Sequence, residues 1–178
     1  MPPEDHHSLY LDLIWYFMAL RIATSEDLPA IIAMERLPES RRYVGQWTEE
    51  RHRSTLASAD ARYYVWEQPL GALQGFAILR GLAEASRSVE LKRILVAEPG
   101  HGLGRRMLLA LMRIAFEELG AHRLFLDVFE DNARARYLYE SLGFVYEGTL
   151  REAALRDGGY CTLRLMSVLD REFAAHNA

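Results

Sequence analysis

Residues 132–144 read Asn132-Ala-Arg-Ala-Arg-Tyr-Leu-Tyr-Glu-Ser-Leu-Gly-Phe144 and carry the clearest structural signal in the chain. Asp131 and Asn132 are suitable helix N-caps because their side-chain oxygens can accept a backbone N–H of the first turn. Gly143 suits the end of the same helix because glycine tolerates the left-handed conformation common there. An apolar strand is predicted just upstream, from Leu124 to Phe129. The pattern therefore predicts a strand, a short loop and a helix in immediate succession.

A second unit of this kind lies upstream, where a predicted strand, Val89 to Val96, leads into Pro99-Gly-His-Gly-Leu-Gly104. An amphipathic helix follows and ends at about Leu119, before Gly120. Glycines let backbone approach a phosphate, and the helix N-terminus attracts an anion. The glycine spacing differs from that of a Rossmann loop, and Arg105-Arg106 replaces the Lys-Ser/Thr of a P-loop. Both familiar nucleotide loops are therefore disfavoured.

The other elements are predicted from periodicity, caps and turn residues. They are a strand at Leu20 to Ala23, a helix at Glu26 to Glu35, a loop over residues 37–47, a helix capped by Thr48, strands at Tyr63 to Glu67 and Leu73 to Leu79, and a hairpin around Arg156-Asp-Gly-Gly159. Strand–helix alternation followed by a terminal hairpin predicts an α/β protein with a mixed sheet and helices on both faces.

The composition fits one globular domain. The chain has 178 residues, of which 50% are hydrophobic and 26% charged, and its net charge is −4. These values exclude collagen-like, disordered and disulfide-scaffold proteins. They also give no basic field for nucleic acid or an anionic membrane. Cys161 is the only cysteine and lies in an apolar run, so we expect a buried structural thiol and a reducing, cytoplasmic location.

The first 17 residues differ in character from the remainder of the chain. The apolar stretch from Leu9 to Leu20 is too short to span a membrane, and Glu4 and Asp5 replace the basic start of a signal peptide. The segment that begins at Met18 resembles the start of a separate chain, with Met18 as a possible translation start. We therefore interpret residues 1–17 as an N-terminal arm or a non-native extension, and residues 18–178 as the single domain.

The run from Asn132 to Phe144 resembles the second signature of the GNAT superfamily of acyl-coenzyme A-dependent N-acyltransferases. That signature is Asn-x-x-Ala-x-x-x-Tyr-x-x-x-Gly-Phe, and it is matched by Asn132, Ala135, Tyr139, Gly143 and Phe144. Five fixed residues would recur by chance in a chain of this length with a probability on the order of 10⁻⁴. The resemblance covers about residues 20–172, with the elements in the expected order.

The family's first signature, Arg/Gln-x-x-Gly-x-Gly/Ala, is matched only in part. Gly102 and Gly104 supply its glycines, while Pro99 stands in the Arg/Gln position. Proline has neither an N–H nor a side-chain donor. Binding of a diphosphate is then expected to depend more on the amides of residues 101–106 and on Arg105 or Arg106.

The resemblance implies a GNAT fold with a central mixed, largely antiparallel and twisted sheet. It implies transfer of an acetyl group from acetyl-CoA to a primary amine by direct attack in a ternary complex. The acceptor is either a protein N-terminus or a small-molecule amine, and the closing segments resemble the branch that contains ribosomal-protein N-terminal acetyltransferases. Two alternatives are a non-catalytic module that senses acyl-CoA and an unrelated nucleotide-binding protein. The sequence is compatible with a monomer or a homodimer.

The resemblance also suggests catalytic residues. Glu90 matches a strand position at which several GNAT enzymes carry a glutamate base, and it would act through water. The alternative is a solvated glutamate or an ion-pair partner of Lys92 or Arg93. Tyr139 is the expected acid for the departing thiolate, and its alternative role is that of an ordinary core tyrosine. Tyr137 is the weaker choice because it points elsewhere on the helix.

Coenzyme contacts are implied on three segments. Backbone groups of Ile94, Leu95 and Val96 would line the pantetheine arm. Asn132 and Ala135 would contact the same arm from the helix. The phosphate loop would contribute His101, Gly102, Leu103, Gly104, Arg105 and Arg106. The histidines show no spacing that suggests a metal site.

Acceptor selection in this fold usually comes from the segment around the first two helices and from the last hairpin. Here the first group is Arg41, Arg42, Tyr43 and Trp47, and the second is Arg151, Glu152 and Arg156. Two arginines near aromatic residues could hold a carboxylate or a protein terminus. The alternative is that these are ordinary surface arginines.

Overall fold

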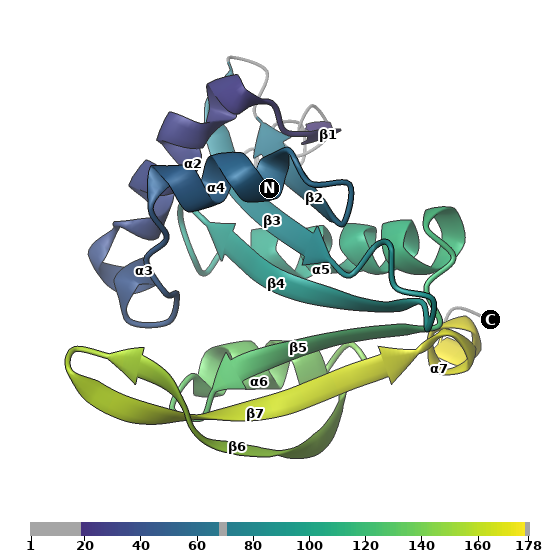
Figure 1. The fold of residues 1–178 in the computed structure, drawn as a ribbon. Helices are drawn as coiled ribbons and strands as arrows, with labels where there is room; N and C mark the ends of the chain where they lie inside the picture. Colours follow the sequence, from purple (N-terminus) through teal and green to yellow (C-terminus); the bar gives the residue numbers. More distant parts are fainter. Residues whose placement is uncertain (1–18, 68–70, 177–178) are drawn as a thin grey trace, which may run out of the picture.

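The computed structural model describes residues 19–67 and 71–176. The expectation for residues 1–17 lies outside this range. Within the described residues, seven strands form one twisted sheet in the order β1-β2-β3-β4-β5-β7-β6 (Figure 1). The strands are β1 (Ala19–Ile22), β2 (Ala61–Glu67), β3 (Leu73–Arg80), β4 (Ser88–Val96), β5 (Arg123–Phe129), β6 (Val145–Arg156) and β7 (Gly159–Leu169). The α-helices are α2 (Leu28–Glu35), α3 (Pro38–Arg41), α4 (Glu49–Leu56), α5 (Leu103–Arg113), α6 (Ala133–Glu140) and α7 (Asp170–His176).

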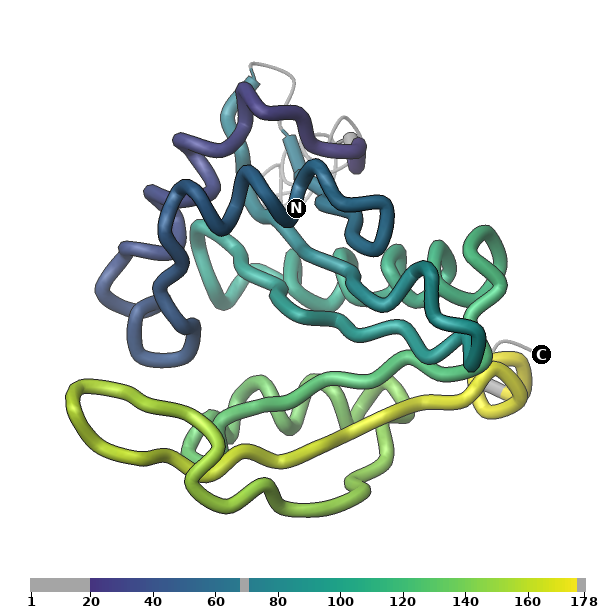
Figure 2. Tube along the Cα trace, viewed as in Figure 1, coloured from purple at the N-terminus to yellow at the C-terminus, as the bar shows by residue number. Residues whose placement is uncertain are grey.

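The sheet is mixed, and its parallel pair is β4 with β5. These two strands pair only over Ser88–Glu90 and Arg123–Phe125. Beyond that point their traces move apart, as Figure 2 shows. The other strand pairs are antiparallel. The sheet is thus continuous at one end of β4 and β5 and divided at their carboxyl ends.

Helices cover both faces of the sheet, as predicted (Figure 1). On one face, Ile31 of α2 packs with Tyr63, Phe76 and other residues of β2 and β3. On the other, α5 and α6 pack on the sheet in a separate core that includes Leu108 and Tyr139. Each core buries apolar side chains of a helix against the sheet, which is the main source of stability for such layers.

A register shift between β3 and β4 decides which face each β4 residue occupies. Leu91 pairs with Leu79 and Arg93 pairs with Ile78, so Lys92 is the extra residue of a bulge. Leu91 joins the core beneath α5, whereas Ile78, the partner of Arg93, joins the core beneath α2. The bulge therefore turns the Arg93 side chain toward the α2 face.

Local signals in the sequence correspond to local structure. Thr48 caps α4 by accepting the amide of Arg51 at 3.2 Å. Asp157 and Gly158 both have positive φ, 51° and 80°. Such a two-residue turn matches the twist of the paired strands and closes the predicted hairpin.

The long helix extends to Glu118, before Gly120, as predicted, and its last segment, Ile114–Glu118, is π-helical. Two other expectations need correction. The predicted loop 37–47 contains α3, which starts at Pro38, a residue that favours the first turn of a helix. Cys161 is partly exposed rather than buried, because it lies near the tip of the β6–β7 hairpin.

Among the described residues, no helix has the length and apolar character needed to cross a bilayer.

Candidate functional site

The glycine loop joins the carboxyl end of β4 to the N-terminus of α5. Gly100 and Gly102 have φ of 113° and 78°, a region that favours glycine. Within the described part of the chain, apart from each glycine and its two neighbours in sequence, no atom lies within 4 Å of the Cβ positions that side chains would occupy there. The helix begins at Leu103, and the first intrahelical bond to the loop runs from the Arg106 amide to the Gly102 carbonyl at 3.2 Å. The Arg106 amide is therefore engaged, whereas the amides of residues 103–105 precede the first intrahelical hydrogen bond.

The two signature segments touch each other. A Cβ on Gly104 of α5 would lie 3.8 Å from Leu138 of α6 and 4.0 Å from Val96 of β4. Arg105 donates a hydrogen bond to the Ser141 hydroxyl at 2.9 Å. The end of β4, the start of α5 and helix α6 thus converge at the divided end of the sheet. The Arg105 side chain thus contacts the end of α6, whereas the sequence analysis names Arg105 as a possible ligand of a diphosphate.

The divided end leaves part of the β4 backbone without a strand partner. Ile94, Leu95 and Val96 pair with β3 on one side, while β5 pairs with β4 only up to Glu90. Backbone groups of these three residues that face β5 therefore lack a strand ladder. Such groups can form hydrogen bonds to an extended ligand placed between the strands.

Asn132 caps α6 by accepting the amide of Ala135 at 3.1 Å. Its side-chain oxygen is therefore committed to the helix, and the NH₂ group is the part left for a ligand. The carboxyl ends of parallel strands are where open α/β sheets bind ligands. Asn132, Ala135 and the glycine loop all lie at this end of β4 and β5.

Tyr139 lies on α6 within the core beneath α5 and is 8% exposed. Its ring centroid is 5.7 Å from that of Phe144. Burial raises the pKa of the Tyr139 hydroxyl, and the negative charge of Asp127 raises it further. The phenol therefore holds its proton at neutral pH and is able to donate it. Tyr137, in contrast, is 75% exposed.

Glu90 stands at the last paired position of β4 and β5. Its carboxylate lies 3.0 Å from Lys92 Nζ and 4.0 Å from Arg80 Nη1. Lys92 Nζ also lies 3.5 Å from the Asp127 carboxylate of β5. The pairing of Glu90 with Lys92 is one of the two alternatives open from the sequence. The carboxylates of Glu90 on β4 and Asp127 on β5 thus both contact the Lys92 ammonium, at the point where the two strands separate.

Sequence reasoning did not single out Lys92 and Asp127 as site residues. Asp127 had a detectable signal, since it is the one charged residue within the apolar run from Leu124 to Phe129. Lys92 was expected only as a possible ion-pair partner of Glu90, and its contact with Asp127 depends on the pairing of β4 with β5.

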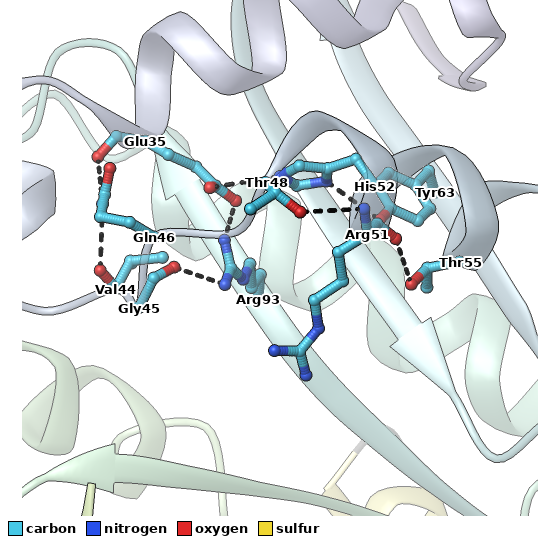
Figure 3. Close-up of polar contacts among 10 residues, drawn as sticks. All are labelled: Glu35, Val44, Gly45, Gln46, Thr48, Arg51, His52, Thr55, Tyr63 and Arg93. Atoms are coloured by element: carbon cyan, nitrogen blue, oxygen red, sulfur yellow. Dashed lines mark hydrogen bonds and ion pairs between the residues drawn. The ribbon is translucent and has the colours of Figure 1, made fainter. Parts of the chain in front are cut away.

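A buried polar network lies on the α2 face of β4 (Figure 3). Arg93 donates to the Glu35 carboxylate of α2, and the side chains of these residues are 4% and 1% exposed. His52 Nε2 of α4 lies 3.3 Å from the same carboxylate, and His52 Nδ1 is 3.1 Å from the Tyr63 hydroxyl of β2. Burial lowers the pKa of His52 and raises that of Tyr63 to about 12. His52 is therefore neutral at pH 7.

The same arginine holds the segment after α3. Arg93 donates to the Gly45 carbonyl and lies over the Trp47 ring, 4.2 Å from its centroid. The Gln46 side chain donates to the Glu35 carbonyl at 2.9 Å and to the Val44 carbonyl at 3.2 Å (Figure 3). These contacts fix the backbone of residues 44–47 against β4.

A group of charged side chains near the surface joins the segment after α3 to β6 and to the loop between β5 and α6. Arg156 of β6 contacts both carboxylate oxygens of Asp131, at 3.2 and 2.8 Å. Arg42, just after α3, reaches the same carboxylate at 3.4 Å. Arg156 also donates to the Arg42 carbonyl at 2.9 Å. Hydrogen bonding to Arg156 lowers the pKa of Asp131. We call Arg42, Asp131 and Arg156 the bridge.

Comparison with known proteins identifies related chains. Residues 30–144, more than half of the chain, match the model of the Acetyltransferase (GNAT) family. A spermidine N(1)-acetyltransferase of Vibrio cholerae is 29% identical over 126 residues, which are 70% of this chain and 73% of that protein. A spermine/spermidine N(1)-acetyltransferase of Bacillus subtilis is 36% identical over 103 residues, or 51% and 68% of the two chains. The crystal structure of the spermidine N-acetyltransferase from Vibrio cholerae in complex with CoA and spermine has a TM-score of 0.78 with 25% identity, covering 89% of this chain and 99% of that one.

Proposed function

This chain belongs to the GNAT acetyltransferase family, and from that premise we propose that it acetylates a primary amine with acetyl-CoA by direct attack in a ternary complex. The observation that carries the proposal is the convergence of the glycine loop, the end of β4 and helix α6 where β4 and β5 separate. The acceptor is proposed to be a small-molecule amine or a protein N-terminus.

The site offers complementary groups for each part of acetyl-CoA. The diphosphate would lie at the N-terminus of α5, where Gly100 and Gly102 leave space and the first helical amides have no intrahelical acceptor. The pantetheine arm would lie between β4 and β5, against backbone groups of Ile94, Leu95 and Val96 and the Asn132 amide. Pro99 adds no donor to this loop.

The proposed reaction needs one proton removed and one supplied. The amine nitrogen forms a bond to the thioester carbonyl carbon while the C–S bond breaks. Glu90 would accept the proton released by the amine through an intervening water, since its carboxylate lies at the point where the strands part. Tyr139 would give its hydroxyl proton to the departing sulfur. Backbone N–H groups of the unpaired β4 segment would hold the carbonyl oxygen as negative charge develops.

Ligand binding and turnover test the proposal together. Saturating acetyl-CoA at 100 times its Kd should stabilise the fold by about 2.7 kcal/mol, which thermal unfolding detects, while ATP and NAD should have no comparable effect. Thiol release should then depend on both acetyl-CoA and an added amine. Equal stabilisation by ATP or NAD, or binding of acetyl-CoA without turnover of any amine, would contradict the proposal.

A further inference from the structure

The bridge carries an excess positive charge at the rim of the divided sheet. Two guanidinium groups, from Arg42 and Arg156, share one carboxylate, that of Asp131. Arg156 donates hydrogen bonds to both carboxylate oxygens of Asp131, and its guanidinium also lies 4.8 Å from the Phe129 ring centroid. Arg156 is therefore fixed, and Arg42 is the more weakly paired of the two arginines.

Arg42 is held in place by its backbone while much of its side chain stays accessible. Its carbonyl accepts a hydrogen bond from Arg156, and the segment that follows is tied to Arg93 through Gly45. The Arg42 side chain is 62% exposed and meets Asp131 through one nitrogen at 3.4 Å. A guanidinium presents five donors in a planar fork, so Arg42 retains donors for an oxyanion.

The charges are balanced closer to the proposed reaction centre. There the carboxylates of Glu90 and Asp127 contact the Lys92 ammonium, and Arg80 Nη1 lies 4.0 Å from Glu90. Asp127 and Asp131 are four residues apart along the chain, and an extended backbone of four residues spans at most about 14 Å. The backbone positions of Asp127 and Asp131 are therefore separated by no more than the length of a small molecule.

We propose that Arg42 and Arg156 form a carboxylate-binding subsite and that the acceptor is a primary amine that also carries a carboxylate. This inference rests on the proposed function and specifies its substrate class. The amine would lie beside Glu90, the proposed base, and the acceptor's carboxylate is held by the bridge. A polyamine has no group for this subsite, so the acceptor differs from the spermidine named for the relatives. A free amino carboxylic acid and a peptide with an acidic side chain near its N-terminus share this chemistry.

Matched acceptor pairs test the subsite. Initial rates of thiol release are measured with ω-amino acids from glycine to 8-aminooctanoate, each against its primary amide, which keeps the length and removes the charge. The peptide arm compares Gly-Asp amide with Gly-Asn amide, and spermidine is included. We expect kcat/KM to favour the charged member of at least one pair by about 10-fold or more, the size of one charge-assisted hydrogen bond. The arm in which the preference occurs identifies the source of the carboxylate.

Three variants separate recognition from general damage to the rim. Arg42→Gln should bring the charged-to-neutral ratio close to one. Asp131→Asn removes the competing carboxylate and should raise the ratio by up to about fivefold. Arg36→Gln removes one exposed positive charge outside the bridge and should leave the ratio unchanged.

The possible outcomes distinguish this proposal from the one it rests on. Equal rates for the charged and neutral members of every pair, a faster reaction with spermidine than with all of them, or a fall in the ratio for Asp131→Asn would overturn the subsite and leave acetyl transfer intact. Absence of thiol release with every amine would overturn the proposed function and the subsite together.

Discussion

Two clusters in this protein combine arginine with carboxylate, and their burial sets them apart. Arg93 and Glu35 are almost completely enclosed, with side chains 4% and 1% exposed. Arg42 and Asp131 of the bridge are 62% and 38% exposed. A buried charge must be paired within the fold, whereas an exposed one is partly satisfied by water and can exchange that water for a ligand. The difference in burial assigns the first cluster to structure and leaves the second accessible for the proposed recognition of a carboxylate.

The largest effect is expected from breaking the buried cluster. Arg93→Met should lower the free energy of unfolding by about 3–5 kcal/mol, because it leaves the Glu35 carboxylate buried without its cation. Urea unfolding at pH 7 measures the loss. The matched control, Arg42→Gln, should cost no more than about 1 kcal/mol. Equal losses in the two variants would remove the distinction between the clusters.

A double variant sharpens the same comparison. Combining Arg93→Met with Glu35→Leu removes both charges and should recover part of the stability lost in Arg93→Met alone. The loss of unfolding free energy in Glu35→Leu alone is the reference for this comparison. If adding Glu35→Leu to Arg93→Met lowers the stability by that same amount, the two residues do not act as a pair.

A smaller effect is expected from pH, through His52. The enclosed imidazole binds fewer protons in the folded state than in the unfolded state, because burial lowers its pKa. Stability should therefore fall as the pH drops below the unfolded value of about 6.5, toward the lower pKa of the folded state. The contribution of one histidine is at most about 1.4 kcal/mol per pH unit.

The pH effect is isolated by comparing the wild type with His52→Gln in urea unfolding at pH 7.5, 6.5 and 5.5. The difference in unfolding free energy between the two proteins should change across this range in favour of His52→Gln at low pH. A constant difference at all three values would show that His52 does not titrate with folding.

Features set by neighbouring residues could be predicted from the sequence. Asn132 and Thr48 cap their helices as expected, and the Asp157-Gly158 turn closes the predicted hairpin. Each depends on hydrogen bonds or backbone angles within a few residues. The position of the glycine loop could also be predicted, and Gly100 and Gly102 there adopt positive φ values, which glycine tolerates.

Features that depend on distant residues could not be predicted in this way. Arg93 and Glu35 are 58 positions apart, and they meet only because the bulge at Lys92 turns Arg93 toward α2. A strict alternation along β4 would have placed Arg93 on the same face as Leu91. The approach of Asp127 to Lys92 likewise depends on the pairing of β4 with β5.

Helix α6 is proposed to supply the acid for acetyl transfer, and one pair of variants on that helix tests this role most directly. Tyr139→Phe should lower kcat about 100-fold or more, the usual effect of losing a general acid, with the Kd for acetyl-CoA unchanged. Tyr137→Phe removes an exposed hydroxyl two residues away and should leave kcat unchanged. Full activity in Tyr139→Phe, or an equal loss in both variants, would contradict the assignment of Tyr139 as the acid.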